Sequence, residues 1–461
     1  MHKNSKWLYL FMLLLFAVGL VTACSSGDSD DASGTNNDDS EDASSDENGS
    51  NDDGSEASDG EQIELRILWW GSQDRHDRTL EVIDMYMEEN PNVTISPEFS
   101  GWDGYWEKMA TQAAGGNMPD IVQMDYAYLN EYVGRELLVD LNSLVDDGTL
   151  DLSDVDDVYI DGGKVDGSLY AVNLGANVHG VAYDPALFEE AGVEVPETEY
   201  TYEELNEMGV ELSNNLDGAY GIQPFAGVNN LRHYLRQNGV SLFNEDGTAL
   251  GYDDDQLLVD FLQLTVDMQE SGAAAPADVF MDAGSNIEQQ PIVNGDTAMF
   301  LDIYSNQIVA LESAAGRPLE LALSPMLEGG EDGHFLKPSQ FFSVTSHSEQ
   351  QAEAAKFISY FTNNIEANEV LNAERGVPIA TAVREHLRGL QDPVGVKMFD
   401  FVELAQDYSK PIDPPEPEGA TEILSMYENE VEHPMYYQQI SPEEAAANFR
   451  EKASEILANN Q

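Results

Sequence analysis

The stretch IELRILWWGSQDRHDRTL, residues Ile63 to Leu80, sets the architecture of this chain. Its first part is largely apolar and predicts a buried strand, and the Gly-Ser pair after it predicts a turn. Beyond the turn, Leu80, Ile83 and Met87 recur at helical spacing and share one face of a predicted helix. An Asn-Pro pair at Asn90 ends that helix. A strand followed at once by a helix is the first half of a strand-helix-strand unit.

The same alternation continues as far as Asp125. Apolar residues at alternate positions from Val93 to Phe99 predict a strand near a sheet edge, because Pro97 cannot donate a hydrogen bond to a neighbouring strand. A second helix is predicted over 105–114, and the apolar segment DIVQMD, 120–125, predicts a third strand. This order predicts a parallel α/β sheet. Ligands lie beyond the carboxyl ends of such strands, so the loops 71–75 and 125–126 are predicted to face a ligand.

Helix start signals recur through the rest of the chain. Thr201–Glu204, Ser348–Gln351 and Ser441–Glu444 each resemble a capping box, the last with proline at the first helical position. The proline-rich segment KPIDPPEPEG, 410–419, predicts a surface loop between the last helices. These signals describe stability and say nothing of chemistry.

The amino-terminal segment predicts an exported, lipid-anchored protein. Lys3 and Lys6 precede an apolar run, 7–20, that is too short for a comfortable transmembrane helix and is typical of a secretory signal peptide. The run ends in VTAC, which resembles the bacterial lipobox, so residues 1–23 are predicted to be a lipoprotein signal peptide and Cys24 the lipidated residue. Cys24 is the only cysteine, which excludes an intramolecular disulfide and a cysteine metal cluster.

Residues 24–60 follow as a predicted tether. From Ser25 to Gly60 there are 13 acidic residues, no basic residue and no aromatic or branched aliphatic residue. Such a segment cannot bury enough apolar surface to offset the entropy of ordering, so we expect it to be disordered. We therefore expect the folded body, 61–461, to be held at the outer face of the cell membrane by the lipid on Cys24.

The charge of the chain restricts its partners. Lys and Arg number 20 against 87 Asp and Glu, which gives a formal net charge of −67. This charge repels nucleic acid phosphates and anionic membrane surfaces, so we expect no nucleic acid partner. So acidic a surface is also typical of salt-adapted, halophilic proteins, in which case the acidity reflects the solvent more than the function.

The body resembles the extracellular solute-binding proteins of ABC importers, in particular the group that captures oligosaccharides. Each matching segment is short, and their order and spacing together carry the resemblance. The segments are NPNVTISPEF, GGNMPDIVQMD, SLYAVNLGANVHGVAYDPALFEEAGV, VNGDTAMFLDIYSNQ, FFSVTSHSEQQAEAAKFISYF and RGVPIA. WWGSQ.R and W..YW.KMA are similar to the subgroup associated with rhamnogalacturonan and other pectin oligosaccharides.

The resemblance implies an α/β fold of two lobes, like that of periplasmic binding proteins, with the ligand cleft between them. Three chain crossings between the lobes are expected near 173–177, 301–304 and 336–342. The first lobe is then expected to hold residues 61–173 and 303–338, and the second residues 174–302 and 339–461. Closure of the two lobes about the crossings would trap the ligand.

The resemblance also implies the function and the partners. The chain is expected to be the lipid-anchored substrate-binding protein of an ABC transporter, a monomer that captures oligosaccharides and delivers them to permease subunits in the membrane. No cofactor, no metal and no catalytic residue is expected.

Sugars present apolar C–H faces and a ring of hydroxyl groups, so their binding sites combine aromatic rings with planar polar side chains. Both kinds of side chain occur in the matching segments. The predicted aromatic platforms are Trp70, Trp102, Tyr126, Phe225 and Tyr304, and the predicted polar groups are Gln73, Asp125, Asn177 and Asp302. Trp69 points the other way along its strand and is predicted to be core.

Arg75 and Arg78 place positive charge next to the first strand. In one interpretation they pair with Asp74, Asp77 or Glu81 on the helix surface. In the other, the guanidinium of Arg75 binds the carboxylate of a uronic acid in the ligand. A second basic group, Arg232, His233 and Arg236, is predicted to border the cleft from the other lobe.

Two alternative functions stay open. A lipid-anchored glycosidase or lyase is one, although so many acidic residues make chance carboxylate pairs unavoidable and uninformative. The sequence has no GxSxG, no HExxH and no phosphate-binding glycine loop. A sugar sensor that presents its ligand to a membrane kinase is the other, and it would share the same fold.

Overall fold

A computed structural model describes residues 62–102, 104–284 and 286–459. The predicted signal peptide, Cys24 and the acidic tether lie outside these residues. The folded body forms one compact unit, Gly60–Gln461. Among the helices of the described ranges, none combines the length and the apolar character needed to cross a membrane.

The first of two main sheets has the strand order β2-β1-β3-β13-β6. Its strands are β1 (Ile63–Trp70), β2 (Val93–Ser100), β3 (Ile121–Met124), β6 (Val172–Asn173) and β13 (Phe341–Val344). β1 pairs in parallel with β2 and β3, whereas β13 pairs antiparallel with β3 and β6. The predicted parallel α/β unit is confirmed, and β2, which contains Pro97, is the edge strand that the sequence predicts.

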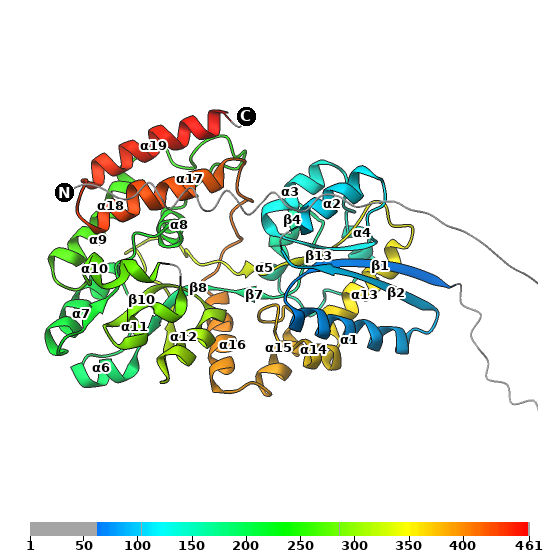
Figure 1. Ribbon diagram of the computed structural model, residues 1–461, viewed down its shortest axis with the longest axis horizontal. Helices are drawn as coiled ribbons and strands as arrows, with labels where there is room; N and C mark the ends of the chain where they lie inside the picture. The colour runs from blue at the N-terminus through cyan, green and yellow to red at the C-terminus, as the bar shows by residue number, and fades with distance from the viewer. Residues whose placement is uncertain (1–61, 103, 285, 460–461) are drawn as a thin grey trace, which may run out of the picture. The chain divides into compact units, whose positions relative to one another are not determined.

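Helices from both ends of the chain pack around this sheet, and Figure 1 shows the blue α1 beside the yellow α13 and α14. These helices are α1 (Gln73–Glu89), α2 (Tyr105–Ala114), α3 (Tyr126–Gly134), α4 (Asn142–Asp146), α5 (Asp157–Ile160), α13 (Gln351–Asn363), α14 (Ile365–Leu371) and α15 (Thr381–Arg388). A short hairpin, β4 (Lys164–Val165) and β5 (Ser168–Leu169), and the 3-10 turn Asp161–Gly163 complete this part. The helix predicted over 105–114 coincides with α2.

Helix α1 begins where the sequence predicts, because the side chain of Ser72 caps it by accepting a hydrogen bond from the backbone N–H of Arg75. Its buried face is rotated from the predicted one. Of the three predicted residues only Ile83 is buried, while Leu80 and Met87 lie at the edges of the stripe. Trp69, predicted to be core, is fully buried in β1.

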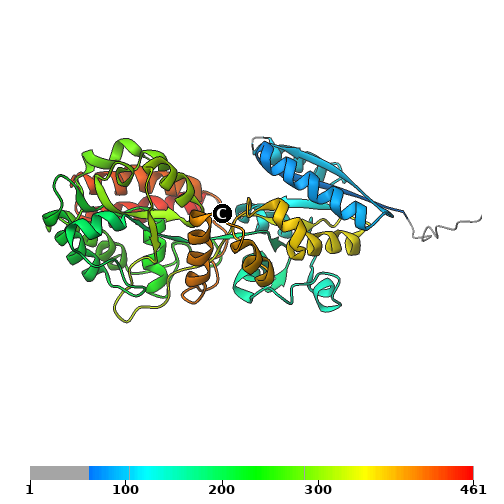
Figure 2. The same ribbon diagram turned by 90° about the horizontal axis from the view of Figure 1, so that it is seen from below.

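The second sheet has the strand order β11-β8-β10-β9. Its strands are β8 (His179–Tyr183), β9 (Tyr220–Ile222), β10 (Thr297–Tyr304) and β11 (Glu320–Ala322). Its helices are α6 (Pro185–Ala191), α7 (Tyr202–Asn215), α8 (Val228–Gln237), α9 (Gln256–Glu270), α10 (Ala277–Phe280), α11 (Pro291–Asn294), α12 (Ile308–Ala315), α16 (Pro393–Gln406), α17 (Ala420–Tyr427), α18 (His433–Tyr436) and α19 (Pro442–Asn459). The 3-10 turns Met281–Ala283, Ile287–Gln289 and Ser305–Gln307 and the π-helical turn Glu428–Glu432 complete it. Both views show α17 and α19 lying side by side (Figures 1 and 2).

Within the described residues, three segments connect the part built around the first sheet with the part built around the second: two contain strands, and the third, 389–392, joins α15 to α16. The first leads from β6 to β8 through β7 (Ala176–Asn177), and the second leads from β11 to β13 through β12 (Lys337–Pro338). β7 and β12 pair antiparallel, so the two connections run together as a small ribbon. These segments include the crossings expected near 173–177 and 336–342.

The expected crossing near 301–304 is wrong. Leu301–Tyr304 is the end of β10, which is paired with β8 on one side and β9 on the other, so the chain does not leave the second sheet there. The lobe boundaries drawn from it are wrong as well. β11 lies within 303–338 but belongs to the second sheet, and β13 lies beyond 338 but belongs to the first, because strand pairing decides membership.

The predicted capping boxes differ in outcome. The box at Thr201 and Glu204 is present in full, with both reciprocal hydrogen bonds. At Ser441 the hydroxyl caps the N–H of Glu444, and Pro442 opens α19 as predicted. The box at Ser348 is wrong, since its hydroxyl donates to the carboxylate of Asp120 and the helix begins later, at Gln351.

Candidate ligand-binding site

A cavity of about 710 Å³ is lined by elements of both sheets and by the connections between them. Its volume is in the range of small-molecule binding sites. The wall is formed by the start of α1, the loop between β3 and α3, both strands of the β7-β12 ribbon, the first turns of α8 and the loop after α14. The proline-rich segment 412–416 completes it.

Five of the ten residues predicted to bind ligand line this cavity. They are Arg75, Asp125, Tyr126, Asn177 and Tyr304. Asp125, Tyr126 and Arg75 follow the carboxyl ends of β3 and β1 and line the same cavity, and that the loops 71–75 and 125–126 face a ligand stays a prediction. Asp125 also caps α3 by accepting from the N–H of Ala127 at 3.0 Å.

The other predicted residues lie elsewhere. Phe225 is 2% exposed and stacks on Tyr202 in the core of the second sheet, so its ring has no free face for a sugar. Trp70 is also buried, packed edge-to-face against Tyr105 with 4.9 Å between ring centroids. Gln73 donates to Asp77 on the exposed side of α1.

Trp102 and Asp302 are absent from the cavity wall for different reasons. Trp102 is 45% exposed and packs edge-to-face on Trp70, so its exposed face lies outside this cavity. Asp302 is not among the lining residues, and its Oδ1 accepts from Nδ2 of Asn229 at 3.0 Å and lies 2.8 Å from Nε2 of His179. Asn229 lines the cavity, so Asp302 orients a wall residue.

Amide and hydroxyl groups are held in place along the ribbon side of the cavity. Asn177 donates to the hydroxyl of Ser339 at 2.9 Å and accepts from that of Ser305 at 3.4 Å. The hydroxyl of Tyr304 donates to Oδ1 of Asn229 at 3.3 Å. These groups can each donate to or accept from a polar ligand.

Lys337, on β12, lies over the ring of Tyr304, with Nζ 4.5 Å from the ring centroid. Within the described residues it makes no ion pair. Burial lowers the pKa of its ammonium group, and the nearby carboxylate of Asp125 opposes that shift. The result is a cation and an aromatic face presented together in the cavity.

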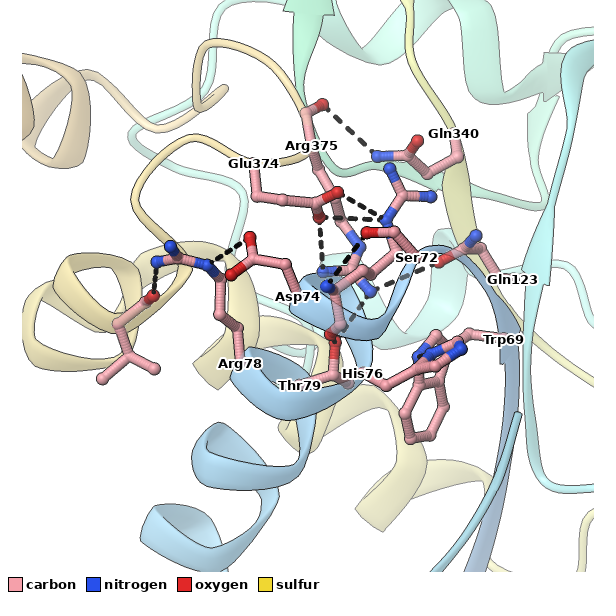
Figure 3. Close-up of polar contacts among 12 residues, drawn as sticks. Trp69, Ser72, Asp74, His76, Arg78, Thr79, Gln123, Gln340, Glu374 and Arg375 are labelled. Carbon is pink, nitrogen blue, oxygen red and sulfur yellow. Dashed lines mark hydrogen bonds and ion pairs between the residues drawn. The ribbon is translucent and has the colours of Figure 1, made fainter. Parts of the chain in front are cut away.

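Arg75 does not pair with the acidic residues of its own helix. Its Nε lies 2.9 Å from both carboxylate oxygens of Glu374, in the loop after α14, and Nη1 donates to the carbonyl oxygen of Trp70 at 3.3 Å. Arg78 behaves as the helix-surface interpretation predicts, since it donates to Asp74 at 2.8 Å (Figure 3).

Of the second predicted basic group, Arg232 lines the cavity, whereas Arg236 and His233 do not. Arg232 pairs with Glu416. Arg236 is buried and fastens the proline-rich segment, through an ion pair with Asp413 and a 2.9 Å hydrogen bond to the carbonyl oxygen of Pro411. His233 is buried beside Gln237, away from the cavity wall.

Sequence reasoning missed several wall residues. The segment 412–416, predicted to be a plain surface loop, forms one side of the cavity, and the hydroxyl of Tyr126 donates to its Asp413 carbonyl oxygen. Lys337, Glu374 and Arg375 were not predicted either. For Lys337 and Arg375 the only signal was the rarity of basic residues in this chain, and Glu374, one of 87 acidic residues, had none.

In the ranges that the structure describes, no three His, Cys, Asp or Glu side chains come together as a metal site. The cavity wall combines aromatic, amide, basic and acidic side chains.

Comparison with known proteins agrees with the fold. The model of the family described as bacterial extracellular solute-binding protein matches residues 81–394, more than half of the chain. The chain belongs to this family. An extracellular solute-binding protein of family 1 from Alicyclobacillus acidocaldarius is 29% identical with a TM-score of 0.80, covering 87% of this chain and 100% of its own.

Other similar proteins bind or transport carbohydrates. A periplasmic oligogalacturonide-binding protein from Yersinia enterocolitica, in complex with saturated digalacturonic acid, is 25% identical with a TM-score of 0.65 and covers 86% of this chain and 99% of its own. A carbohydrate ABC transporter substrate-binding protein of Streptococcus pneumoniae is 27% identical over 30% of this chain and 29% of its own. The first matched relatives, from Brucella abortus and Brucella suis, are 21% identical, and this chain spans 41% of their length.

Glu432, at the end of the π-helical turn, lies close to Asp302, since a carboxylate oxygen of each lies within 4 Å of the position of a Cβ atom at Gly227. Its Oε1 accepts from the hydroxyl of Tyr436 at 3.1 Å. Burial raises the pKa of Glu432 to about 8, and the carboxylate of Asp302 adds to that increase. Burial acts in the same direction on Asp302, but hydrogen bonds with His179 and Asn229 leave the pKa of Asp302 lowered. Glu432 is therefore the member of this carboxylate pair that holds a proton.

Replacing Glu432 by Gln is expected to stabilise the protein at alkaline pH. Between the ordinary pKa of 4.5 and the folded value of about 8, the folded state keeps a proton that the unfolded state releases, so the stability of the wild type falls as pH rises through this window. Glutamine stays neutral and loses this dependence. At pH 9 we expect the variant to be more stable by on the order of 2 kcal/mol, with little difference at pH 4.5.

Thermal or urea unfolding across pH 4.5 to 9 measures this difference. Glu430→Gln is the matched control, because Glu430 lies in the same turn but is exposed and paired with Lys452. A Glu432→Gln variant that is less stable than wild type at pH 9, or whose effect does not change with pH, contradicts the assignment.

Proposed function

We propose that this solute-binding protein captures an oligosaccharide that contains uronic acid residues, for uptake by an ABC permease. The single observation that carries the proposal is the pairing of Lys337 with the ring of Tyr304 in the cavity wall. The ammonium group over one face of the Tyr304 ring can attract a carboxylate, and the sugar ring that carries this carboxylate can pack on the remaining surface of the tyrosine.

The rest of the wall fits the same ligand. Tyr126 and Phe335 add aromatic surface, while Asn177, Asn229 and Ser339 supply amide and hydroxyl groups for sugar hydroxyls. Phe243 and Asn244 extend this mixture toward the second sheet. A cavity of about 710 Å³ leaves space for more than one sugar ring.

The charge of the protein favours an acidic ligand over a neutral one at this position. A body so rich in carboxylates repels anions, so an anionic sugar needs local positive charge at its site. Four of only 20 Lys and Arg in the chain line this one cavity, Arg75, Arg232, Lys337 and Arg375, together with the acidic residues Asp125, Glu374, Asp413 and Glu416. Arg75, Arg232 and Arg375 pair with acidic residues, and Lys337 makes no ion pair within the described residues, so its charge is the one that an anionic ligand can use.

The comparisons support the class of ligand. The Yersinia enterocolitica protein is described as binding an oligogalacturonide and was solved with digalacturonic acid, and the pneumococcal relative is described as a carbohydrate transport component. The proposal that this chain binds a uronate rests in addition on its own residues Lys337 and Tyr304.

We propose that capture is followed by closure of the parts around the two sheets, with the β7-β12 ribbon as the hinge, and by docking on the permease. Binding has to favour the closed state for release to be controlled by transport. No chemical step is involved. The monomeric receptor is held at the outer face of the membrane by a lipid on Cys24, with residues 24–60 as its tether and a surface adapted to salt.

The lipid anchor has a direct test. We expect the protein to be recovered with the membrane fraction of the producing cells, and Cys24→Ser to be recovered in the medium or periplasmic fraction with unchanged ligand affinity, because Cys24 is the only candidate for lipidation. Immunoblotting of the fractions makes the comparison. Equal recovery of both forms with the membrane contradicts anchoring through Cys24.

Isothermal titration tests the ligand class. The panel pairs galacturonate oligosaccharides with neutral galactose oligosaccharides of equal length, in a buffer of high salt. We expect the acidic members to bind more tightly, and Lys337→Met to weaken them by about tenfold or more while leaving neutral sugars unchanged, since it removes one charge-assisted contact.

Lys410→Met is the matched control, because Lys410 is an exposed lysine paired with Glu331 and lies outside the cavity wall. Equal binding of acidic and neutral sugars, or an equal loss in both lysine variants, contradicts uronate recognition. Uptake that survives deletion of the permease would instead favour a sensor.

A further inference from the structure

The loop after α14 has an unusual backbone. Asn372 and Ala373 both have positive φ, 48° and 54°, in the left-handed region that non-glycine residues rarely occupy. The next two residues, Glu374 and Arg375, lie in the cavity wall. Strained backbone of this kind persists only where the surroundings hold it, and it concentrates at binding sites.

The side chain of Arg375 is held firmly. It is 4% exposed, Nη2 donates to the hydroxyl of Thr79 at 2.9 Å and to Oε1 of Gln123 at 3.4 Å, and its guanidinium lies 5.2 Å from the ring centroid of Phe361. Its carbonyl oxygen accepts from Gln340 at 3.3 Å (Figure 3). A guanidinium fixed in this way is already in position for a partner.

That guanidinium has unused hydrogen-bond donors. Nε and Nη1 of Arg375 are buried and make no hydrogen bond with the described residues. Buried donors without a partner are rare and costly in proteins. The nearest negative charge is Oε2 of Glu374, 3.6 Å from Nη1, which is an ion pair but too long for a hydrogen bond.

Glu374 therefore serves two guanidinium groups with one carboxylate. It lies 2.9 Å from Nε of Arg75 and 3.6 Å from Nη1 of Arg375 (Figure 3). Gly71 gives Arg75 the space for this approach, because a Cβ atom at Gly71 would lie 2.3 Å from Cδ of Arg75. These three groups, two cations and one anion, carry a net charge of +1, although the whole cavity lining has as many acidic as basic side chains.

We propose that Arg75 and Arg375 form a carboxylate-binding subsite, and that Glu374 occupies it as an internal carboxylate until a uronate group of the ligand takes its place. The inference rests on the proposed function for the identity of the ligand, because the uronate belongs to the bound oligosaccharide. It also assigns a role to Glu374, which competes with the ligand carboxylate for the two arginines and need not contact the ligand itself.

This arrangement makes the cavity selective against neutral sugars. When Glu374 moves aside, two guanidinium groups lie close together in a largely buried wall, and only another anion can offset their repulsion. A uronate provides that anion and a neutral sugar does not. The carboxylate of Glu374 thus lowers the apparent affinity for every ligand that displaces it. Only an acidic ligand offsets this cost, because its own carboxylate replaces the contacts of Glu374 with the two arginines.

The test uses Glu374→Gln, which keeps the shape of the side chain and removes its charge. Without ligand, we expect a lower melting temperature than wild type, because the two arginines lose their shared counter-charge. Sodium galacturonate, at constant ionic strength, is expected to restore the lost stability, and galactose is not. In isothermal titration, the dissociation constant for digalacturonate is expected to fall about tenfold, because the competing carboxylate is gone.

Glu312→Gln is the matched control. Glu312 pairs with Lys397 at 2.8 Å, and the exposed fractions of the two side chains, 22% and 18%, resemble those of Glu374 and Arg75, 17% and 15%. Neither Glu312 nor Lys397 lines the cavity. Galacturonate is expected to have no specific effect on the stability of this control. If the role of Glu374 were purely structural, Glu374→Gln and Glu312→Gln would respond to galacturonate in the same way.

A second variant protects the test from a folding failure. Arg375→Lys keeps the charge but loses the planar pair of donors, so we expect weaker binding of digalacturonate with neutral sugars unaffected. The subsite is wrong if digalacturonate binds wild type but binds Glu374→Gln no more tightly, and the proposed function then still stands. If no oligosaccharide binds either protein while galacturonate still stabilises Glu374→Gln, the subsite stands and the proposed function is wrong.

Discussion

The antiparallel pairing of β13 with β3 and β6 is the constraint on which the rest of the structure depends. It obliges the chain to return to the first sheet after it has built β8 to β11 of the second. The return strand, β12, then runs beside the outgoing strand β7 and brings Lys337 and Ser339 next to Asn177. One wall of the cavity is thus a direct consequence of how the first sheet is completed.

The chemistry of the cavity follows from placing scarce basic residues among many acidic ones. Arg75, Arg232 and Arg236 are each met by an acidic partner from a distant segment, namely Glu374, Glu416 and Asp413. These ion pairs fasten the loops at 372–376 and 410–416 to the wall. Because partly buried ion pairs contribute little net stability, their value lies in specifying which loops line the cavity.

The sequence predicted the parts of this account that depend on local pattern. The β1-α1-β2-α2-β3 unit, the edge position of β2 and the cavity at the carboxyl ends of β1 and β3 follow from periodicity and from the rule for parallel sheets. It could not show that Phe225 is covered by Tyr202, or that Arg375 is held by Thr79 and Gln123, since these contacts join residues far apart in the chain. The lobe boundaries failed for the same reason, because pairing of β11 and β13 is not local.

The most direct test of the account is a crystal structure of the purified protein with digalacturonate. The account predicts ligand density in the cavity, with one sugar ring on Tyr304 near Lys337 and one carboxylate within about 3 Å of the guanidinium groups of Arg75 and Arg375. The carboxylate of Glu374 should then have turned away from both arginines. Ligand bound elsewhere, or bound in this cavity with Glu374 still on Arg75, would contradict the account.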